Sequence, residues 1–459
     1  MRTGVERRGA ARHRRDRLLV SFWFMPVVMA LAAVLLAWVM YWIDGLLPNE
    51  VLENSRFVLA GSTDELRSNL LSIAGTVLAT AGVVFTLLTL PLSTVAAQYG
   101  SRLLRLFLGD RTAQFVLGMF VATFVYCVFA ALALPPADIE IESPQLTATV
   151  GVYLMLVTFA TLILLVQHIS TMLQAPNIAA AAGAELRAVV RAEIAEEIVY
   201  GAEGDGLETV PGAGGVRAGL PETENYPVRA VATGYIQFVD PEIMLTLARE
   251  KDLVIRLLHQ PGQFVRRGAV VALVWPADRV TQEVARLIHR AYQLGSVRTP
   301  TQDIEYAVNQ LTEMAVRAMS PAINDPFTAM TCLDHVGVGL GEFIQRGERS
   351  SRYYDKDGRL RLLLEPVTFP ALLGAAFDML RHASCDNANV LLHMLAVIDL
   401  IGQETTAPAA RQELLRHASL IQAESQAGAL IEEDRQRIAH CCDALLSKLK
   451  ATPSAALPQ

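Results

Sequence analysis

Residues 68–101, SNLLSIAGTVLATAGVVFTLLTLPLSTVAAQYGS, decide the fold class of this chain. Arg67 and Arg102 flank the stretch, and none of its 34 residues is Asp, Glu, Lys or Arg. About 20 predominantly apolar residues are enough for a helix to cross the hydrocarbon core of a bilayer. The stretch therefore predicts a transmembrane helix, and the other segments are interpreted from it outward.

Small and hydroxyl-bearing residues recur at steps of three and four along this helix, so they share one face. This first stripe consists of Ser72, Gly75, Ala79, Gly82, Thr86, Thr89 and Ser93. Small residues let a second helix approach closely, and hydroxyl groups bond to that helix or to a carbonyl one turn back. Two interpretations stay open: a packing seam, which is the commoner use of such a stripe, and the wall of a polar pathway.

Three further hydrophobic stretches bring the number of predicted transmembrane helices to four. They cover residues 19–43, residues 112–134 and a region that begins near 147 and stays uncharged as far as Ala184. The chain of 459 residues is 52% hydrophobic, more than a soluble protein of this size normally contains. The lipid bilayer is therefore the first predicted partner.

Charges between the spans predict the orientation. The first 17 residues include seven arginines and the segment after the second span is basic, whereas residues 44–67 and 135–146 are mainly acidic. Because positive segments stay in the cytoplasm, we predict a multi-pass protein of the bacterial inner (plasma) membrane with both termini cytoplasmic. The basic leader is expected to contact anionic headgroups and not nucleic acid.

The predicted architecture is an α-helical integral membrane domain followed by a cytoplasmic α+β region. The boundaries are 1–17 for a basic cytoplasmic leader, 18–184 for the four transmembrane helices, 185–227 for an amphipathic helix and flexible linker, 228–278 for a small β-module, 279–450 for a helical domain and 451–459 for a tail. Helices are predicted near 279–293, 301–319, 326–346, 369–383, 388–402 and 408–450, and a short hairpin turns at 355–358.

The β-module is predicted from strands at 228–238 and 252–259 with a helix at 241–251 between them. The run 261–268, PGQFVRRG, resembles the hammerhead turn of lipoyl-type and biotin-type small barrels. No lysine stands on that turn to carry a swinging arm. We therefore interpret the module as structural.

The most distinctive soluble stretch is 317–329, RAMSPAINDPFTA, called the corner below. Ser320 and Pro321 predict the end of one helix, Asn324 or Asp325 can cap the next, and Pro326 suits its first position. A structural turn is the favoured interpretation. The alternative is that Arg317 and the backbone amides of the corner bind an anion or a partner loop.

Three motifs of the chain resemble those of a large bacterial family of predicted membrane proteins, domain of unknown function 2254 (DUF2254). The corner SPAINDPFTA is similar to the family's SPGINDPFTA, the elbow QYGSRLL at 98–104 to its QYSPRLL, and Gln167-His168-Ile169 to its histidine near the end of the fourth span. The resemblance covers the first span to about residue 440. It implies the membrane topology already predicted, and no established reaction.

His168 is the one side chain in residues 143–184 that changes charge near neutral pH. It shares a second stripe, on the fourth span, with Thr147, Gly151, Thr158 and Thr161. An ionisable group inside a membrane is a candidate for proton relay or anion contact. The alternative, given equal weight, is that it lies at the membrane interface.

The elbow after the second span offers five candidate functional residues: Gln98, Tyr99, Arg102, Arg105 and Asp110. Arg102, Arg105 and Arg111, with Asp110, either bind lipid phosphates or a permeating anion, or they only determine topology, which is the favoured interpretation.

No catalytic, cofactor or metal residue is predicted. The chain contains no GxxxxGK[ST], GxSxG or HExxH motif, and its five cysteines lack the paired spacing of zinc sites or disulfide frameworks. We therefore do not expect an enzyme.

The leading functional prediction is an oligomeric channel or transporter-like protein with a cytoplasmic regulatory domain. A homo-oligomer is expected because four spans are too few to enclose a pathway alone, and spans two and four would meet across their stripes. The alternative is a membrane-anchored sensor or scaffold that binds a ligand or partner through the corner.

Overall fold

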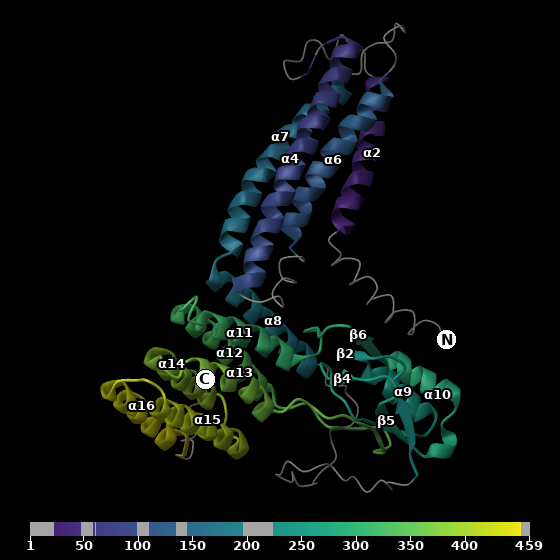
Figure 1. Ribbon diagram of the computed structural model, residues 1–459. Helices are drawn as coiled ribbons and strands as arrows, with labels where there is room; N and C mark the ends of the chain where they lie inside the picture. The colour runs from purple at the N-terminus through teal and green to yellow at the C-terminus, as the bar shows by residue number, and fades with distance from the viewer. Residues whose placement is uncertain are drawn as a thin grey trace, which may run out of the picture. The chain divides into compact units, whose positions relative to one another are not determined.

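The computed structural model describes residues 23–46, 58–59, 61–98, 110–134, 145–195 and 224–450. They divide into two units, one ending at Ile178 and the other beginning at Ala179. The first unit is a set of long helices, and the second is a mixed region of strands and helices (Figure 1).

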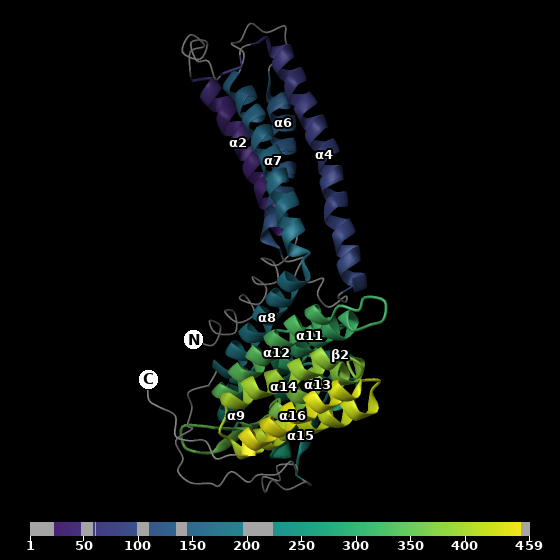
Figure 2. The same cartoon turned by 90° about the vertical axis from the view of Figure 1, so that its left-hand side faces the viewer.

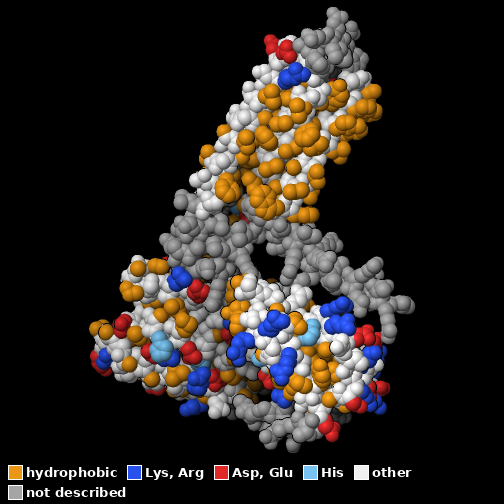
Figure 3. Space-filling model, turned by 45° about the vertical axis from the view of Figure 1, so that its right-hand side comes forward, with side chains coloured by type: hydrophobic (Ala, Val, Ile, Leu, Met, Phe, Trp, Pro, Cys, Tyr) orange, Lys and Arg blue, Asp and Glu red, His pale blue; other side chains and the backbone are white. Residues whose placement is uncertain are grey.

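The first unit contains α2 (Phe24–Asp44), α4 (Thr63–Gln98), α6 (Arg111–Ala133) and α7 (Gln145–Met172). All four are long and apolar enough to cross a membrane. Hydrophobic side chains cover the visible face of this unit, with few charges among them (Figure 3). The four predicted spans are therefore confirmed as helices of suitable length and composition.

Helix α6 is the centre of the first unit, since α2, α4 and α7 all pack against it. Its Phe120 and Tyr126 are fully buried, together with Leu70 of α4 and Leu165 of α7. Figure 2 shows α4 at the edge of the four helices. The interior of this unit is thus built around one helix, and α4 keeps much of its surface exposed.

Charged side chains cap the spans at one end of the first unit. The carboxylate of Asp44, the last residue of α2, accepts the backbone N–H of Leu146 and of Thr147 at 2.9 and 2.7 Å. Arg67 donates to the carbonyl oxygen of Leu134 at 2.7 Å, just beyond α6. Helix ends leave unpaired N–H and C=O groups, and an opposite charge also favours each helix dipole. Asp44 and Arg67, which lie in the loop predicted for residues 44–67, therefore bind the free backbone groups at helix ends.

The structure ends the fourth span at Met172 and starts a new helix, α8 (Ala175–Ala195), three residues later. Ala179 and Ala182 are fully buried, and a side-chain atom added at Gly183 would lie 2.7 Å from the His335 ring. The last six residues of the uncharged region, 179–184, therefore belong to the second unit, where one side of the helix is buried. The boundary between the units accordingly precedes the predicted one at 184.

The second unit contains two sheets. One has the order β1-β5-β3-β8-β7 and the other the order β4-β2-β6. The strands are β1 (Tyr226–Arg229), β2 (Gly234–Val239), β3 (Val254–Leu257), β4 (Phe264–Val265), β5 (Val270–Trp275), β6 (Tyr292–Gly295), β7 (Arg352–Tyr354) and β8 (Leu360–Leu363).

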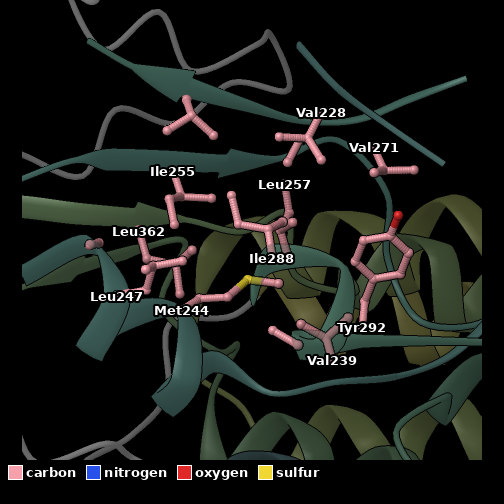
Figure 4. Packing of buried hydrophobic residues seen from close by; sticks show 14 of the residues in the cluster. Val228, Val239, Met244, Leu247, Ile255, Leu257, Val271, Ile288, Tyr292 and Leu362 are labelled. Atoms are coloured by element: carbon pink, nitrogen blue, oxygen red, sulfur yellow. The ribbon is translucent and has the colours of Figure 1, made fainter. Parts of the chain in front are cut away.

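The predicted β-module recruits strands from outside its predicted bounds. The predicted hairpin at 355–358 exists as β7 and β8, and β8 pairs in parallel with β3. Strand β6, which no pattern predicted, pairs with β2. Figure 4 shows the shared core, in which Ile255, Leu257 and Leu362 of the strands pack near Met244 of α9 (Pro241–Glu250) and Ile288 of α10 (Gln282–Ala291).

The remaining helices match the predicted ranges closely. They are α11 (Ile304–Ala318), α12 (Pro326–Arg346), α13 (Phe369–Ala383), α14 (Ala388–Gln403), α15 (Pro408–Ala427) and α16 (Glu432–Lys450), and a short 3₁₀ turn, η2 (Ala277–Arg279), lies between β5 and α10. The single helix predicted for 408–450 is two helices. The chain turns at Gly428, where a side chain would collide with the carbonyl of Cys385.

Candidate functional site

The structure brings together two residues that the sequence had singled out separately, His168 and Asp110. Asp110 caps the start of α6 by accepting the backbone N–H of Ala113 at 2.8 Å. Its other contact is His168, one turn before the end of α7, whose Nε2 lies 3.0 Å from the same carboxylate oxygen. The Asp110 side chain is 15% exposed and that of His168 is 31% exposed.

A hydrogen bond between a carboxylate and an imidazole can hold a proton. The pair joins the residue just before one span to the last turn of another. Both side chains are partly exposed. This geometry is compatible with both interpretations of His168, a relay and an interfacial group.

The second stripe, on α7, lies inside the first unit. Thr158 is fully buried, and its hydroxyl is 2.7 Å from that of Thr123 on α6. The hydroxyl of Tyr126 donates to the carbonyl of Thr147 at 2.9 Å. A side-chain atom added at Gly151 would lie 2.6 Å from Leu70. In this chain, then, the α7 stripe packs against α6 and α4.

The first stripe, on α4, lies on the outside. Ser72, Gly75, Ala79, Gly82, Thr86 and Thr89 are exposed, and among the described residues no atom beyond the neighbouring backbone of α4 lies within 4 Å of a side-chain atom built at Gly75 or Gly82. The buried face of α4 is instead formed by large residues, Leu66, Leu70, Ile73, Val77 and Val84. Within one chain the two stripes therefore do not meet.

The exposed hydroxyls of α4 are not left without acceptors. Thr86 donates to the carbonyl of Gly82 at 3.0 Å, and Thr89 to that of Phe85 at 3.0 Å. This bonding within the helix lets a threonine face lipid at low cost. The side chain of Ser93 lies outside the described part of the structure.

Most of the elbow also lies outside the described residues. Gln98 ends α4, but its side chain is not among those described, and Tyr99, Arg102 and Arg105 fall in the undescribed range 99–109. Asp110 is the one elbow candidate with a described environment. Its role as the cap of α6 was not predicted.

The corner has the predicted local structure. Helix α11 ends before Ser320, and Asp325 caps α12 by accepting the N–H of Thr328 at 3.1 Å, with Pro326 in the first turn. The left-handed residue is Asn324, with φ of 48°. Because the Asp325 carboxylate occupies the start of α12, it holds the position that an anion would take.

The guanidinium of Arg317 pairs with Glu313, one turn earlier on α11, at 3.1 Å. Ser320 donates its hydroxyl to the carbonyl of Arg317 at 2.6 Å. Pro321 and Ala322 are exposed. These contacts favour the structural interpretation of the corner.

A family model described as "Predicted membrane protein (DUF2254)" matches residues 20–399, which include all four spans and the corner. The chain belongs to this family. Relatives of the DUF2254 chain include uncharacterised proteins of Mycobacterium bovis and Mycobacterium tuberculosis, each 25% identical over 392 residues, which is 83% of this chain and 72% of the relative. No solved structure matches it.

Sequence reasoning missed a cavity of about 70 Å³ within the second unit of this DUF2254 protein. Its walls include Glu193 of α8, Gln302, and Arg349 after α12. Arg349 donates to Glu193 at 2.8 Å, and its Nη2 is buried with no acceptor among the described residues. The lining residues come from six stretches between Glu193 and Val367 that are far apart in the sequence, so no local motif predicted the cavity.

The described residues contain no group of three or more His, Cys, Asp or Glu side chains that could hold a metal ion. All five cysteines are free. Burial raises the pKa of the Cys332 thiol to about 12 and that of Cys442 to about 11. These two thiols therefore stay protonated and unreactive at neutral pH.

Proposed function

We propose that this DUF2254 protein is a subunit of an oligomeric channel or transporter-like membrane protein. In this proposal the exposed stripe of α4 meets the same surface of other copies and borders the pathway. The observation that carries the proposal is the outward position of Ser72, Gly75, Gly82 and Thr86 on a helix with the composition of a span.

Helix packing in lipid supports the association step. Lipid tails are as apolar as leucine, so helices associate through close contact between small residues and through polar bonds. Gly75 and Gly82 leave open space on the surface of α4, whereas α6 and α7 bury their small residues within the chain. The α4 stripe is the surface of the first unit best suited to a further helix.

The Asp110–His168 pair supports the transport step. It is an ionisable pair at the end of two candidate spans, with Nε2 of His168 3.0 Å from the carboxylate. Ionisable groups in such positions commonly belong to ion or proton pathways. Both residues remain partly exposed, so an ion or proton could exchange with them.

Ion flux through reconstituted protein tests the proposal. Proteoliposomes with the full chain should conduct ions, and Thr86→Leu with Thr89→Leu should reduce flux at least about fivefold by placing two bulky apolar side chains on the stripe. The matched control is Thr76→Leu with Thr80→Leu, which makes the same two substitutions on a neighbouring row of α4.

Two outcomes contradict the proposal. One is unaltered flux in the Thr86, Thr89 variant. The other is an equal loss in both double variants, which would indicate a general effect on α4 and not a pathway along the stripe.

A second function, a membrane-anchored sensor, is favoured by the cavity beside Arg349. The buried Nη2 of Arg349 needs an acceptor, which a bound carboxylate or carbonyl group would supply. Native mass spectrometry of the detergent-purified full chain should then show a retained small molecule that is lost in Arg349→Leu. A mass equal to the polypeptide alone in both proteins would argue against the sensor.

A further inference from the structure

The cavity beside Arg349 is lined by both strands and helices of the second unit. Among its apolar walls, Val239 ends β2, Leu257 ends β3 and Phe343 lies on α12. Its volume is about 70 Å³. A single water needs about 10–15 Å³ of such space, so the cavity has room for about five to seven non-hydrogen atoms. Apolar walls with a few polar groups are typical of a small-molecule site.

Arg349 lines the cavity and has one hydrogen-bond donor to spare. Its Nε donates to the hydroxyl of Tyr353 at 2.7 Å, and its Nη1 donates to Glu193 at 2.8 Å. Its Nη2 is buried and has no acceptor among the described residues. A buried donor without a partner has lost its bond to water, so an acceptor on a ligand would restore a bond that folding removed.

The charges around the cavity decide which kind of acceptor suits Nη2. Arg349 is the only Lys or Arg among the described lining residues, and the carboxylate of Glu193, whose side chain is 11% exposed, already balances its charge. The second carboxylate of the lining, Glu365, pairs with Arg256 at 3.6 Å. No surplus positive charge is left for an anion, and burying an uncompensated charge is costly. A neutral carbonyl oxygen accepts from Nη2 without that cost.

His259, another lining residue, offers the complementary group, an acceptor. The amide oxygen of Gln263 accepts the backbone N–H of Gln260 at 3.3 Å and lies 3.1 Å from Nδ1 of His259. Because this oxygen only accepts, Nδ1 carries the proton, and Nε2 of the neutral imidazole is an acceptor. No described residue donates to Nε2. A ligand with an N–H or O–H group can therefore bond to it.

We propose that the cavity binds a small uncharged carbonyl compound that carries its own hydrogen-bond donor, such as a short carboxamide. The carbonyl oxygen accepts from Nη2 of Arg349, and the donor bonds to Nε2 of His259. Gln302 serves as wall, because both ends of its amide already bond to the backbone of Val239, at 2.8 and 3.0 Å. The inference rests on the second proposed function, the sensor, and narrows the class of its ligand.

Three probes of nearly equal size test the ligand class: propanamide, butanone and propanoate. Propanamide has the carbonyl and the donor, butanone has only the carbonyl, and propanoate has a negative charge in place of the donor. Dissociation constants are measured on the detergent-purified full chain by saturation-transfer NMR titration. Propanamide should bind about fivefold more tightly than butanone. Propanoate should bind at least about fivefold more weakly than propanamide because its charge is not compensated.

Two variants test the assigned residues. His259→Leu removes the acceptor, so the affinity for propanamide should fall about fivefold, to that for butanone, while the affinity for butanone stays unchanged. Arg349→Met removes the donor and should weaken both neutral probes at least about fivefold. The matched control is His382→Leu on α13, which replaces a histidine with a side chain 66% exposed outside the cavity and should change no affinity.

Equal affinity of propanamide for the unaltered chain and for His259→Leu would overturn the proposal. The unchanged binding of butanone in the same variant verifies that the cavity is folded. Tighter binding of propanoate than of propanamide would overturn the uncharged class but leave a ligand site, so the sensor function would stand. Binding of none of the three probes would also overturn the proposal, and the sensor function would fail with it only if the native mass equals that of the polypeptide alone.

Discussion

Two stripes with the same spacing have opposite positions in the first unit. On α7, Gly151 and Thr158 face the interior and contact α6 and α4. On α4, Gly75 and Gly82 face outward with no neighbour within 4 Å. The periodicity of small residues therefore does not say by itself whether a stripe lies in the interior of the unit or on its outside.

The large apolar side chains decide which face of each helix lies in the interior of the unit. Helix α7 keeps Ile163 and Leu164 outside, with exposed fractions of 71% and 60%, so its stripe is the face left for the interior. Helix α4 instead buries Leu70, Val77 and Val84 completely. Burying those side chains in the first unit leaves the opposite face, with the stripe, on the outside.

The largest expected contrast is between Gly151→Leu and Gly82→Leu. The first variant forces a side chain onto Leu70 and should lower the free energy of unfolding of the monomer by about 2–3 kcal/mol. The second faces open space and should change it by less than about 0.5 kcal/mol. Chemical unfolding in detergent measures both, and equal losses would remove the distinction between the stripes.

A smaller contrast is expected for paired hydroxyls. A double-mutant cycle of Thr123→Val and Thr158→Val should give a coupling of about 1 kcal/mol, because their hydroxyls bond between two helices at 2.7 Å. The same cycle at Thr86 and Thr89, whose hydroxyls bond within α4, should give a coupling near zero. The unfolding midpoint of each variant supplies the data. A coupling at Thr86 and Thr89 as large as that of the buried pair would contradict the assignment.

The smallest effect concerns the helix backbone at Gly75. Gly75→Ala should stabilise the monomer by about 0.5 kcal/mol, since alanine favours a helix and its methyl group meets no atom. Gly151→Ala, next to Leu70, should destabilise it. If Gly75 serves association between copies, the stabilised monomer should also show a lower oligomer fraction in sedimentation. A destabilised Gly75→Ala monomer would show that α4 packs differently.

The candidate site was only partly predictable, because its residues meet only when helices that are distant in the sequence pack side by side. The sequence identified His168 as a lone ionisable residue and Asp110 as part of an elbow, 58 positions apart. Their contact depends on α6 and α7 lying side by side with matched ends. The cavity beside Arg349 likewise needs α8 and five later stretches of the chain to come together.

The sequence by itself determined most of the helices and several of their ends. Long apolar runs predicted the four spans, and the residues of the corner predicted the stop of α11 and the cap of α12, because these signals act over a few neighbouring residues. Tertiary structure alone decided which face of α4 is exposed, that residues 179–184 belong to the second unit, and that Asp110 meets His168. Those outcomes depend on how helices rotate and pair to bury their largest side chains, which is a property of distant residues acting together.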